Sequence, residues 1–233
     1  MGPRIWVLLA AAVVMAAGCG GGDANALASG MERLKQGDAR RAADLLERAT
    51  RLHPESATAH ANLGVALWRC GRPRQALTPL RTAAALVPDD PRPKLLLGAV
   101  CMEIGRLDDA YAAFDAARSP APDMAAPKNG IGVIEYRRSQ FGKACTWFEA
   151  ALNAETNYPP ALYNLAITLR TNAANVAQAN ALLRRYAAVA GDDPHAEEVR
   201  KTIGVQAAPA ADSGAAHRPE PRRSGTTTRG HPR

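Results

Sequence analysis

Hydrophobic residues of defined size recur along this chain at a fixed interval of 34 residues. One column contains only glycine or alanine: Gly30, Gly64, Gly98, Gly132 and Ala166. Other columns share the interval: Leu63, Leu97, Ile131 and Leu165; Ala42, Ala76, Ala110 and Ala144; Leu46, Leu80, Phe114 and Phe148. Because a helix, a turn and an antiparallel helix fit into about 34 residues, the pattern predicts an all-α solenoid of about five helical hairpins.

A proline column, Pro54, Pro88 and Pro122, completes the repeat. The ordered columns resemble the tetratricopeptide repeat family, whose pattern runs aromatic, Leu-Gly, aromatic, Ala, Phe, Pro. The resemblance implies a right-handed solenoid over residues 23–204. Its repeats would span about 23–56, 57–90, 91–124, 125–158 and 159–193, followed by a capping helix at 194–204.

Glycine and proline mark the expected helix ends. Gly37, Gly71 and Gly105 lie seven residues after the packing column, where a helix end favours positive φ. Asp90-Pro91 and Asp193-Pro194 are typical of an N-cap followed by the first helical residue. Each first helix should therefore end before its glycine, and new helices should start at the two prolines.

The two terminal repeats depart from the pattern. The first has Ser29 in the bulky column, so we expect its outer face to pack on something else. In the fifth, the small residue arrives one place late, at Ala179, which predicts one extra residue in the preceding turn. The capping helix should turn Glu197, Glu198, Arg200 and Lys201 towards water.

The N-terminal segment is typical of an export signal. Arg4 precedes a 13-residue apolar run that small residues close, too short to span a bilayer. Residues 16–19 resemble a bacterial lipobox, which implies a signal peptide over 1–18, a lipidated Cys19 and a tether over 19–22. In the family reading the anchor would lie on the periplasmic side of the outer membrane. The alternative is an ordinary secreted protein cut after Ala16 or Ala17.

The net charge of +7 does not indicate nucleic-acid binding, because part of it lies in the C-terminal tail. Residues 206–233 contain five arginines against Asp212 and Glu220, and this stretch has no apolar period. We expect residues 205–233 to be a disordered basic tail. The repeats themselves have a modest positive surplus.

Catalytic and metal-binding motifs are missing from the sequence. No His-Glu-x-x-His, Cys-x-x-Cys, Gly-x-Ser-x-Gly or phosphate-binding Gly-Lys loop occurs. The paired aspartates, such as Asp108-Asp109, fall near expected helix starts and are interpreted as caps. Cys70, Cys101 and Cys145 are interpreted as small hydrophobic residues, although a Cys70–Cys101 bridge is conceivable. We expect no enzyme activity, cofactor, metal or small-molecule substrate.

The first helices should line a concave groove that binds a peptide or a partner helix. Superposing the repeats places aromatic, basic and amide residues there; the candidate partner-binding residues are Asn62, Trp68, Arg69, Met102, Asn129, Tyr136, Arg137 and Asn164. The alternative for Trp68 and Tyr136 is packing between neighbouring helices. The carboxylate clamp of some family members is matched here by Asn62 alone.

These observations predict a non-catalytic adaptor anchored to the bacterial envelope. Resemblance to lipoproteins with tetratricopeptide repeats implies a role in assembling an envelope complex such as a pilus or a secretion system. The alternative is a secreted, unanchored helper of cell-wall metabolism that positions an enzyme or a polymer.

Overall fold

The structure is a computed structural model that describes residues 24–171, 175–191 and 193–204. This part of the chain contains helices and no strands. The helices are α1 (Ala24–Lys35), α2 (Ala39–Leu52), α3 (Ala57–Arg69), α4 (Pro73–Leu86), α5 (Pro91–Glu103), α6 (Leu107–Arg118), α7 (Ala125–Arg137), α8 (Phe141–Ala154), α9 (Pro159–Thr171), α10 (Val176–Val189) and α11 (Pro194–Ile203). The predicted signal peptide, Cys19 and the basic tail lie outside the described residues.

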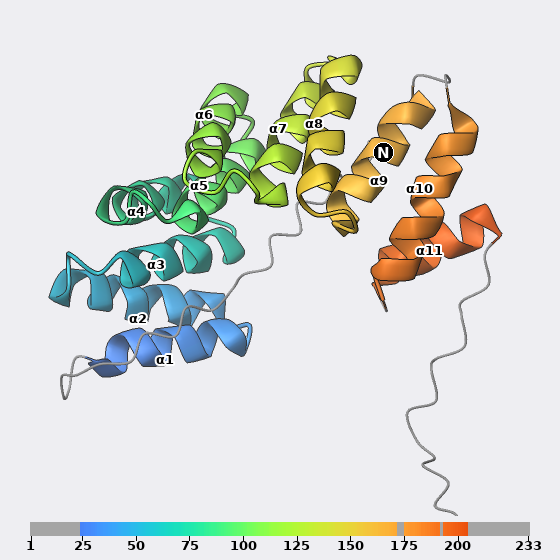
Figure 1. Cartoon of the computed structure of the whole chain (residues 1–233). Helices are drawn as coiled ribbons and strands as arrows, with labels where there is room; N and C mark the ends of the chain where they lie inside the picture. The colour runs from blue at the N-terminus through green and yellow to red at the C-terminus, as the bar shows by residue number, and fades with distance from the viewer. Residues whose placement is uncertain (1–23, 172–174, 192, 205–233) are drawn as a thin grey trace, which may run out of the picture.

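The helices form five hairpins in a curved stack (Figure 1). Each helix packs against the next along the chain, and the first helices of consecutive hairpins also touch one another. The second helices make no such contact with one another among the described residues. The odd-numbered helices therefore form the inner layer. The prediction of an all-α solenoid with a C-terminal capping helix is confirmed.

The glycine column lets the two helices of a hairpin approach closely. A Cβ atom built on Gly98 of α5 would lie 2.7 Å from Cε1 of Phe114 on α6. The same ring also touches the next hairpin, since a Cβ on Gly130 of α7 would lie 2.7 Å from Phe114 Cε2. Phe114 is thus wedged between two helices that both lack a side chain at the point of contact. Equivalent pairs are Gly30 with Leu46, Gly64 with Leu80, and Gly132 with Phe148.

The predicted helix ends are confirmed. Gly37, Gly71 and Gly105 have φ values of 81°, 80° and 80°, and each follows the end of a first helix. In the fourth hairpin the equivalent position is Ser139, with φ of 61°, the only non-glycine residue with positive φ among the described residues. A side chain in this region is strained, because Cβ approaches the following carbonyl oxygen.

Aspartate side chains cap two of the helices that begin with proline, α5 and α11. Asp90 Oδ1 accepts a hydrogen bond from the Arg92 backbone N–H at 2.9 Å, and Asp193 Oδ1 accepts one from the His195 N–H at 2.8 Å. The Arg92 side chain also hydrogen-bonds Asp90, which lowers the pKa of that carboxyl below its usual value. Both caps were predicted from the Asp-Pro pairs.

The N-terminal hairpin has a polar outer face. Ser29 Oγ donates to Asn25 Oδ1 at 2.8 Å, and Gln36 Nε2 donates to Glu32 Oε1 at 3.0 Å. Both pairs join residues four positions apart, within α1 or just after its end. Ser29 thus makes a polar contact within its own helix, and the expectation that this face packs on something else stays a prediction.

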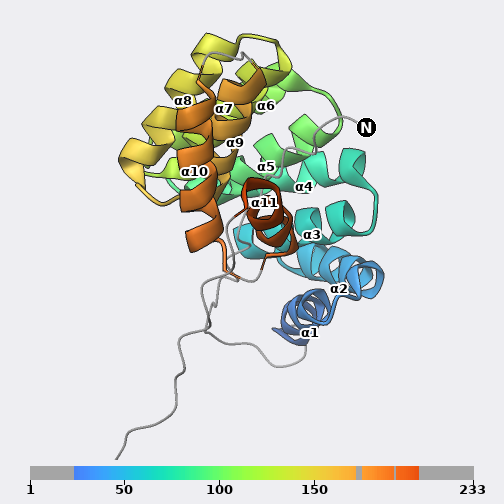
Figure 2. The same cartoon turned by 90° about the vertical axis from the view of Figure 1, so that its right-hand side faces the viewer.

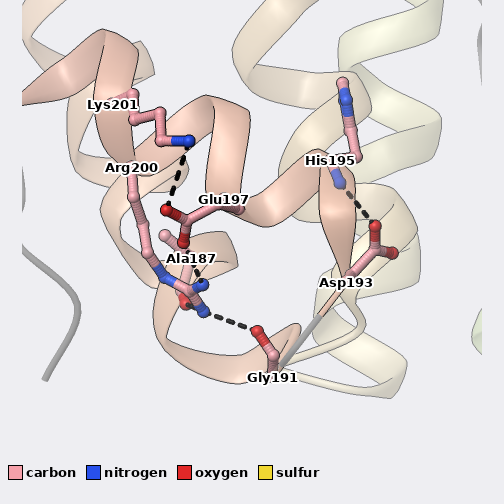
Figure 3. Close-up of polar contacts among 7 residues, drawn as sticks. All are labelled: Ala187, Gly191, Asp193, His195, Glu197, Arg200 and Lys201. Carbon is pink, nitrogen blue, oxygen red and sulfur yellow. Dashed lines mark hydrogen bonds and ion pairs between the residues drawn. The ribbon is translucent and has the colours of Figure 1, made fainter. Parts of the chain in front are cut away.

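The C-terminal cap differs from expectation in one side chain. Glu197, Glu198 and Lys201 are exposed, as predicted. Arg200 is only 15% exposed and points inward (Figure 3), donating to the carbonyl oxygens of Ala187 at 2.7 Å and Gly191 at 2.6 Å. The last carbonyls of α10 have no intrahelical donor and carry the negative end of its dipole, which explains why the arginine turns towards them.

Figure 1 shows α1 and α2 at one end of the stack and α10 and α11 at the other, and the end with α10 and α11 faces the viewer in Figure 2. The irregularity of the fifth repeat is also present. Four residues separate α9 from α10, whereas three separate α7 from α8. Ala179 is fully buried, as the shifted register predicts.

Candidate functional site

The residues that connect successive first helices lie near the C-terminal ends of the odd-numbered helices. They occupy the fourth and fifth positions after the packing column, and we call them the inner strip. The strip consists of Leu34, Lys35, Trp68, Arg69, Met102, Glu103, Tyr136, Arg137, Arg170 and Thr171.

Two arginines of the strip bind the preceding first helix. Arg69 Nη1 donates to the Leu34 carbonyl oxygen at 3.3 Å, and Arg137 Nη1 donates to the Met102 carbonyl oxygen at 2.7 Å. Both acceptors lie in the last turn of a helix, where carbonyls lack intrahelical donors and the dipole favours a cation. The arginines therefore join α3 to α1 and α7 to α5.

The two aromatic residues of the strip make the intervening connections. Trp68 Nε1 donates to Glu103 Oε2 on α5. The Tyr136 hydroxyl lies 3.4 Å from Thr171 Oγ1 on α9. All four connections join residues 35 positions apart. Consecutive first helices are thus linked in alternation, first by an arginine and then by an aromatic residue.

The strip residues differ in how far they face solvent. Trp68 and Tyr136 are half-buried and rest on the hydrophobic core with part of each ring, whereas Arg69 and Arg137 are exposed. The Tyr136 ring also meets Phe141 edge-on, with centroids 5.4 Å apart. One part of each ring therefore packs between neighbouring helices, and the other part faces solvent and is available to a partner.

Three predicted partner-binding residues are buried. Met102 is 2% exposed and belongs to the core of α5. Asn129 and Asn164 are 1% and 4% exposed, and Asn164 Nδ2 donates to Asn129 Oδ1 at 3.0 Å across α7 and α9. Close packing of neighbouring first helices covers these positions, so we remove all three from the candidate surface.

Asn62, the remaining amide, is half-buried and uses one of its two N–H donors within its own helix. Its Nδ2 donates to the Thr58 carbonyl oxygen at 2.8 Å, one turn earlier on α3. The one residue that matched the carboxylate clamp therefore stabilises its own helix. The structure brings together Trp68, Arg69, Tyr136 and Arg137 on the strip, without the amide row that was expected beside them.

The cysteines and the possible metal ligands among the described residues do not cluster. Cys70, Cys101 and Cys145 are free, so the conceivable Cys70–Cys101 bridge is not formed. Burial raises the pKa of the Cys101 and Cys145 thiols above the ordinary value, which disfavours the nucleophilic thiolate. Within 24–171, 175–191 and 193–204, no group of three or more histidine, cysteine, aspartate or glutamate side chains could hold a metal ion.

Sequence reasoning missed the role of Glu103. Glu103 is the acidic residue in a column that otherwise reads Lys35, Arg69, Arg137 and Thr171. The interval of 35 residues between Trp68 and Glu103, one more than the repeat length, is the signal in the sequence that identifies its partner.

None of the helices in the described residues is both long and apolar enough to cross a membrane.

Comparison with known proteins identifies the family. Tetratricopeptide repeat models match residues 27–91 and 102–161, and a further one matches 71–129. The chain belongs to the tetratricopeptide repeat family, and its hairpins form a scaffold of the kind that binds protein or peptide partners. No curated protein matches the chain.

Solved structures share the fold at low sequence identity. The chain is similar to PilF of Pseudomonas aeruginosa, with 22% identity, a TM-score of 0.65, and coverage of 78% of this chain and 85% of PilF. It is similar to MamA of Desulfovibrio magneticus RS-1, with 16% identity, a TM-score of 0.62, and coverage of 79% and 98%. YrrB, described as having an unusual peptide-binding site, shows 16% identity, a TM-score of 0.55, and coverage of 76% and 90%.

Proposed function

We propose that this protein is a non-catalytic adaptor that holds a partner polypeptide on its inner strip. The observation that carries the proposal is the pair of half-exposed aromatic residues, Trp68 and Tyr136, each followed by an exposed arginine. Aromatic and arginine side chains provide most of the binding energy in protein interfaces. Their hydrogen bonds to neighbouring helices hold them in place before a partner arrives, which reduces the entropy lost on binding.

We further propose that the adaptor is anchored in the bacterial envelope through a lipid on Cys19 and takes part in assembling an envelope complex such as a pilus or a secretion system. The support is the lipobox-like sequence at residues 16–19 and the absence of any recognisable catalytic motif. Two acyl chains or more make an anchor effectively stable.

Photocrosslinking tests the binding surface. A photoreactive amino acid replaces Arg69 or Arg137 on the strip, and Arg48, exposed on the second helix α2, serves as the matched control. Crosslinks in native membranes should form at the two strip positions and not at residue 48. Crosslinks at all three positions, or at residue 48 alone, would reject the strip as the binding surface.

Truncation of the aromatic residues then tests their contribution. Trp68→Ala and Tyr136→Ala should each weaken binding of the crosslinked partner by roughly thirtyfold, since hot-spot residues contribute about 2 kcal/mol or more. Helicity and melting temperature are measured alongside. Loss of binding only in step with loss of structure would assign both rings to the core.

Fractionation tests the anchor separately. Wild type should require detergent for release, and Cys19→Ala should appear in the soluble extracytoplasmic fraction. A wild type found there without detergent would reject the anchor and favour the secreted helper of cell-wall metabolism.

A further inference from the structure

The hairpin of α3 and α4 carries positive charge and no carboxylate. Residues 56–88 contain Arg69, Arg72, Arg74 and Arg81 but neither aspartate nor glutamate. Three of these arginines stand within six positions at the turn between the two helices, and all three are exposed. We call Arg69, Arg72 and Arg74 the arginine turn.

The position of two of these arginines is unfavourable for the helix itself. Arg72 is the N-cap residue of α4 and makes no side-chain cap hydrogen bond, and Arg74 is the second residue of the helix. The N-terminus of a helix carries the positive end of its dipole and repels cations. Residues that break a local rule without an evident structural gain are expected at functional sites.

Neighbouring hairpins also carry cations at this place, Arg40 and Arg41 in α2 and the N-cap residue Arg106 in α6, but they supply carboxylates beside them. Asp38 caps α2 by accepting a hydrogen bond from the Arg41 N–H at 3.2 Å. The first turn of α6 contains Asp108 and Asp109, which favour its dipole. The second hairpin therefore differs from these two neighbours in having no carboxylate beside its cations, and not in having cations at the start of the helix.

No nearby carboxylate neutralises the arginine turn. Glu103 accepts from Trp68, while Asp108 and Asp109 pair with Arg138 and Arg106 respectively. Within the described part of the chain Arg72 and Arg74 form no ion pair, and Arg69 donates to a backbone carbonyl. The turn is a cationic surface whose counter-charge is not supplied by this fold.

We propose that the arginine turn binds an acidic segment of the partner polypeptide, an inference that rests on the adaptor function proposed above. Charge complementarity identifies the segment, because its carboxylates would offset both the unpaired guanidinium groups and the dipole of α4. Trp68, half-exposed and directly before Arg69, offers an apolar contact beside the charges. The segment therefore combines several acidic residues with a hydrophobic one. A nucleic acid fits less well, since stable phosphate binding usually uses about six to ten contacts.

The test uses the full-length protein and a defined probe. The probe is a fluorescein-labelled peptide of four glutamates followed by leucine and phenylalanine, and its matched control has glutamine in place of glutamate. Fluorescence anisotropy should show salt-sensitive binding of the acidic peptide only. Arg72→Glu with Arg74→Glu should weaken it by about tenfold or more, as reversal of two contacting charges does. Arg81→Glu, the same charge change further along α4, should stay within about twofold.

A stability readout separates binding from folding. Arg72→Asp places a favoured cap at α4 and should raise the melting temperature by about 2 °C while weakening peptide binding. Equal binding by wild type and the double variant would overturn the proposal. So would equal loss in Arg81→Glu, or tighter binding of an oligonucleotide or of phosphatidylglycerol vesicles that is lost in the same variants. If the peptide does not bind although crosslinks persist at residue 137, this inference is wrong and the adaptor function stands.

Discussion

The hairpins α3–α4 and α5–α6 share one packing design and differ at their surfaces. In each hairpin a buried glycine of the first helix packs against a large residue of the second helix, Gly64 against Leu80 and Gly98 against Phe114. At the start of the second helix, however, one carries arginines without partners and the other carries aspartates that are paired. The comparison shows that the repeat constrains the buried columns, while the columns at the turns are free to differ and can serve binding.

The largest expected effect distinguishes the packing of the two glycines. Gly98→Ala should destabilise by about 1 to 3 kcal/mol, because the added methyl group meets a ring held between two hairpins. A Cβ on Gly64 would come within 2.5 Å of Leu80 Cγ, but Gly64→Ala should cost less, because Leu80 meets one glycine whereas the Phe114 ring is held between Gly98 and Gly130. Chemical denaturation measures both.

Gly142 supplies the control for that experiment. It lies on α8, and a Cβ built there meets nothing within 4 Å. Gly142→Ala should therefore stabilise by about 0.4 to 1 kcal/mol through the unfolded state. If Gly98→Ala behaved like Gly142→Ala, the wedge would have no energetic importance.

The second prediction exchanges the surfaces of the two hairpins. Arg74→Asp with Gln75→Asp gives α4 the acidic first turn of α6 and should stabilise by about 1 kcal/mol. The reciprocal change, Asp108→Arg with Asp109→Gln, should destabilise by a similar amount, because it also frees Arg106 and Arg138 from their carboxylates. Thermal melts at low and high salt check this. Both effects should shrink as salt screens the charges.

The third prediction concerns the turns, where the two hairpins agree and the following one does not. Gly71 and Gly105 have the same φ of 80°, whereas Ser139 occupies this position in the α7–α8 hairpin. Ser139→Gly should stabilise by about 1 kcal/mol, the strain relieved when a left-handed residue loses its Cβ. Ser139→Ala keeps the strain and is the matched control. Equal melting temperatures of the two variants would show that the Cβ atom of residue 139 causes no backbone strain.

The smallest expected effect compares the two aromatic connections. Trp68→Phe removes a hydrogen bond to a charged acceptor and leaves Glu103 unpaired, which should cost about 1 kcal/mol. Tyr136→Phe loses only a long contact of 3.4 Å to Thr171 and should cost less than about 0.5 kcal/mol. Urea denaturation measures the free energy of unfolding of both variants, and Trp68→Phe should lose more than Tyr136→Phe. The reverse order would show that the connection at Glu103 is solvated.

The fold was predictable because buried columns repeat, and the candidate site was predictable only in part. Gly37, Asp90 and Ala179 each signal local geometry through one residue type, so helix ends and the longer turn could be placed from the sequence. The burial of Met102 and Asn129 could not, because it depends on how closely successive first helices pack. Arg200 was also misplaced, since its partners are backbone carbonyls, which leave no mark in the sequence.

Alternating connections along the inner strip give this solenoid an effective period of two hairpins. An exact deletion of residues 91–124 would preserve every buried column, yet it would bring Trp68 opposite Arg137 in place of Glu103 and remove the Met102 carbonyl that Arg137 binds. Deletion of residues 91–158 would instead place Trp68 opposite Thr171, whose hydroxyl contacts the aromatic residue Tyr136 in the full chain and would be free of it in the shortened one. Such an array can be shortened or extended with matched connections in steps of 68 residues, even though its helices repeat every 34.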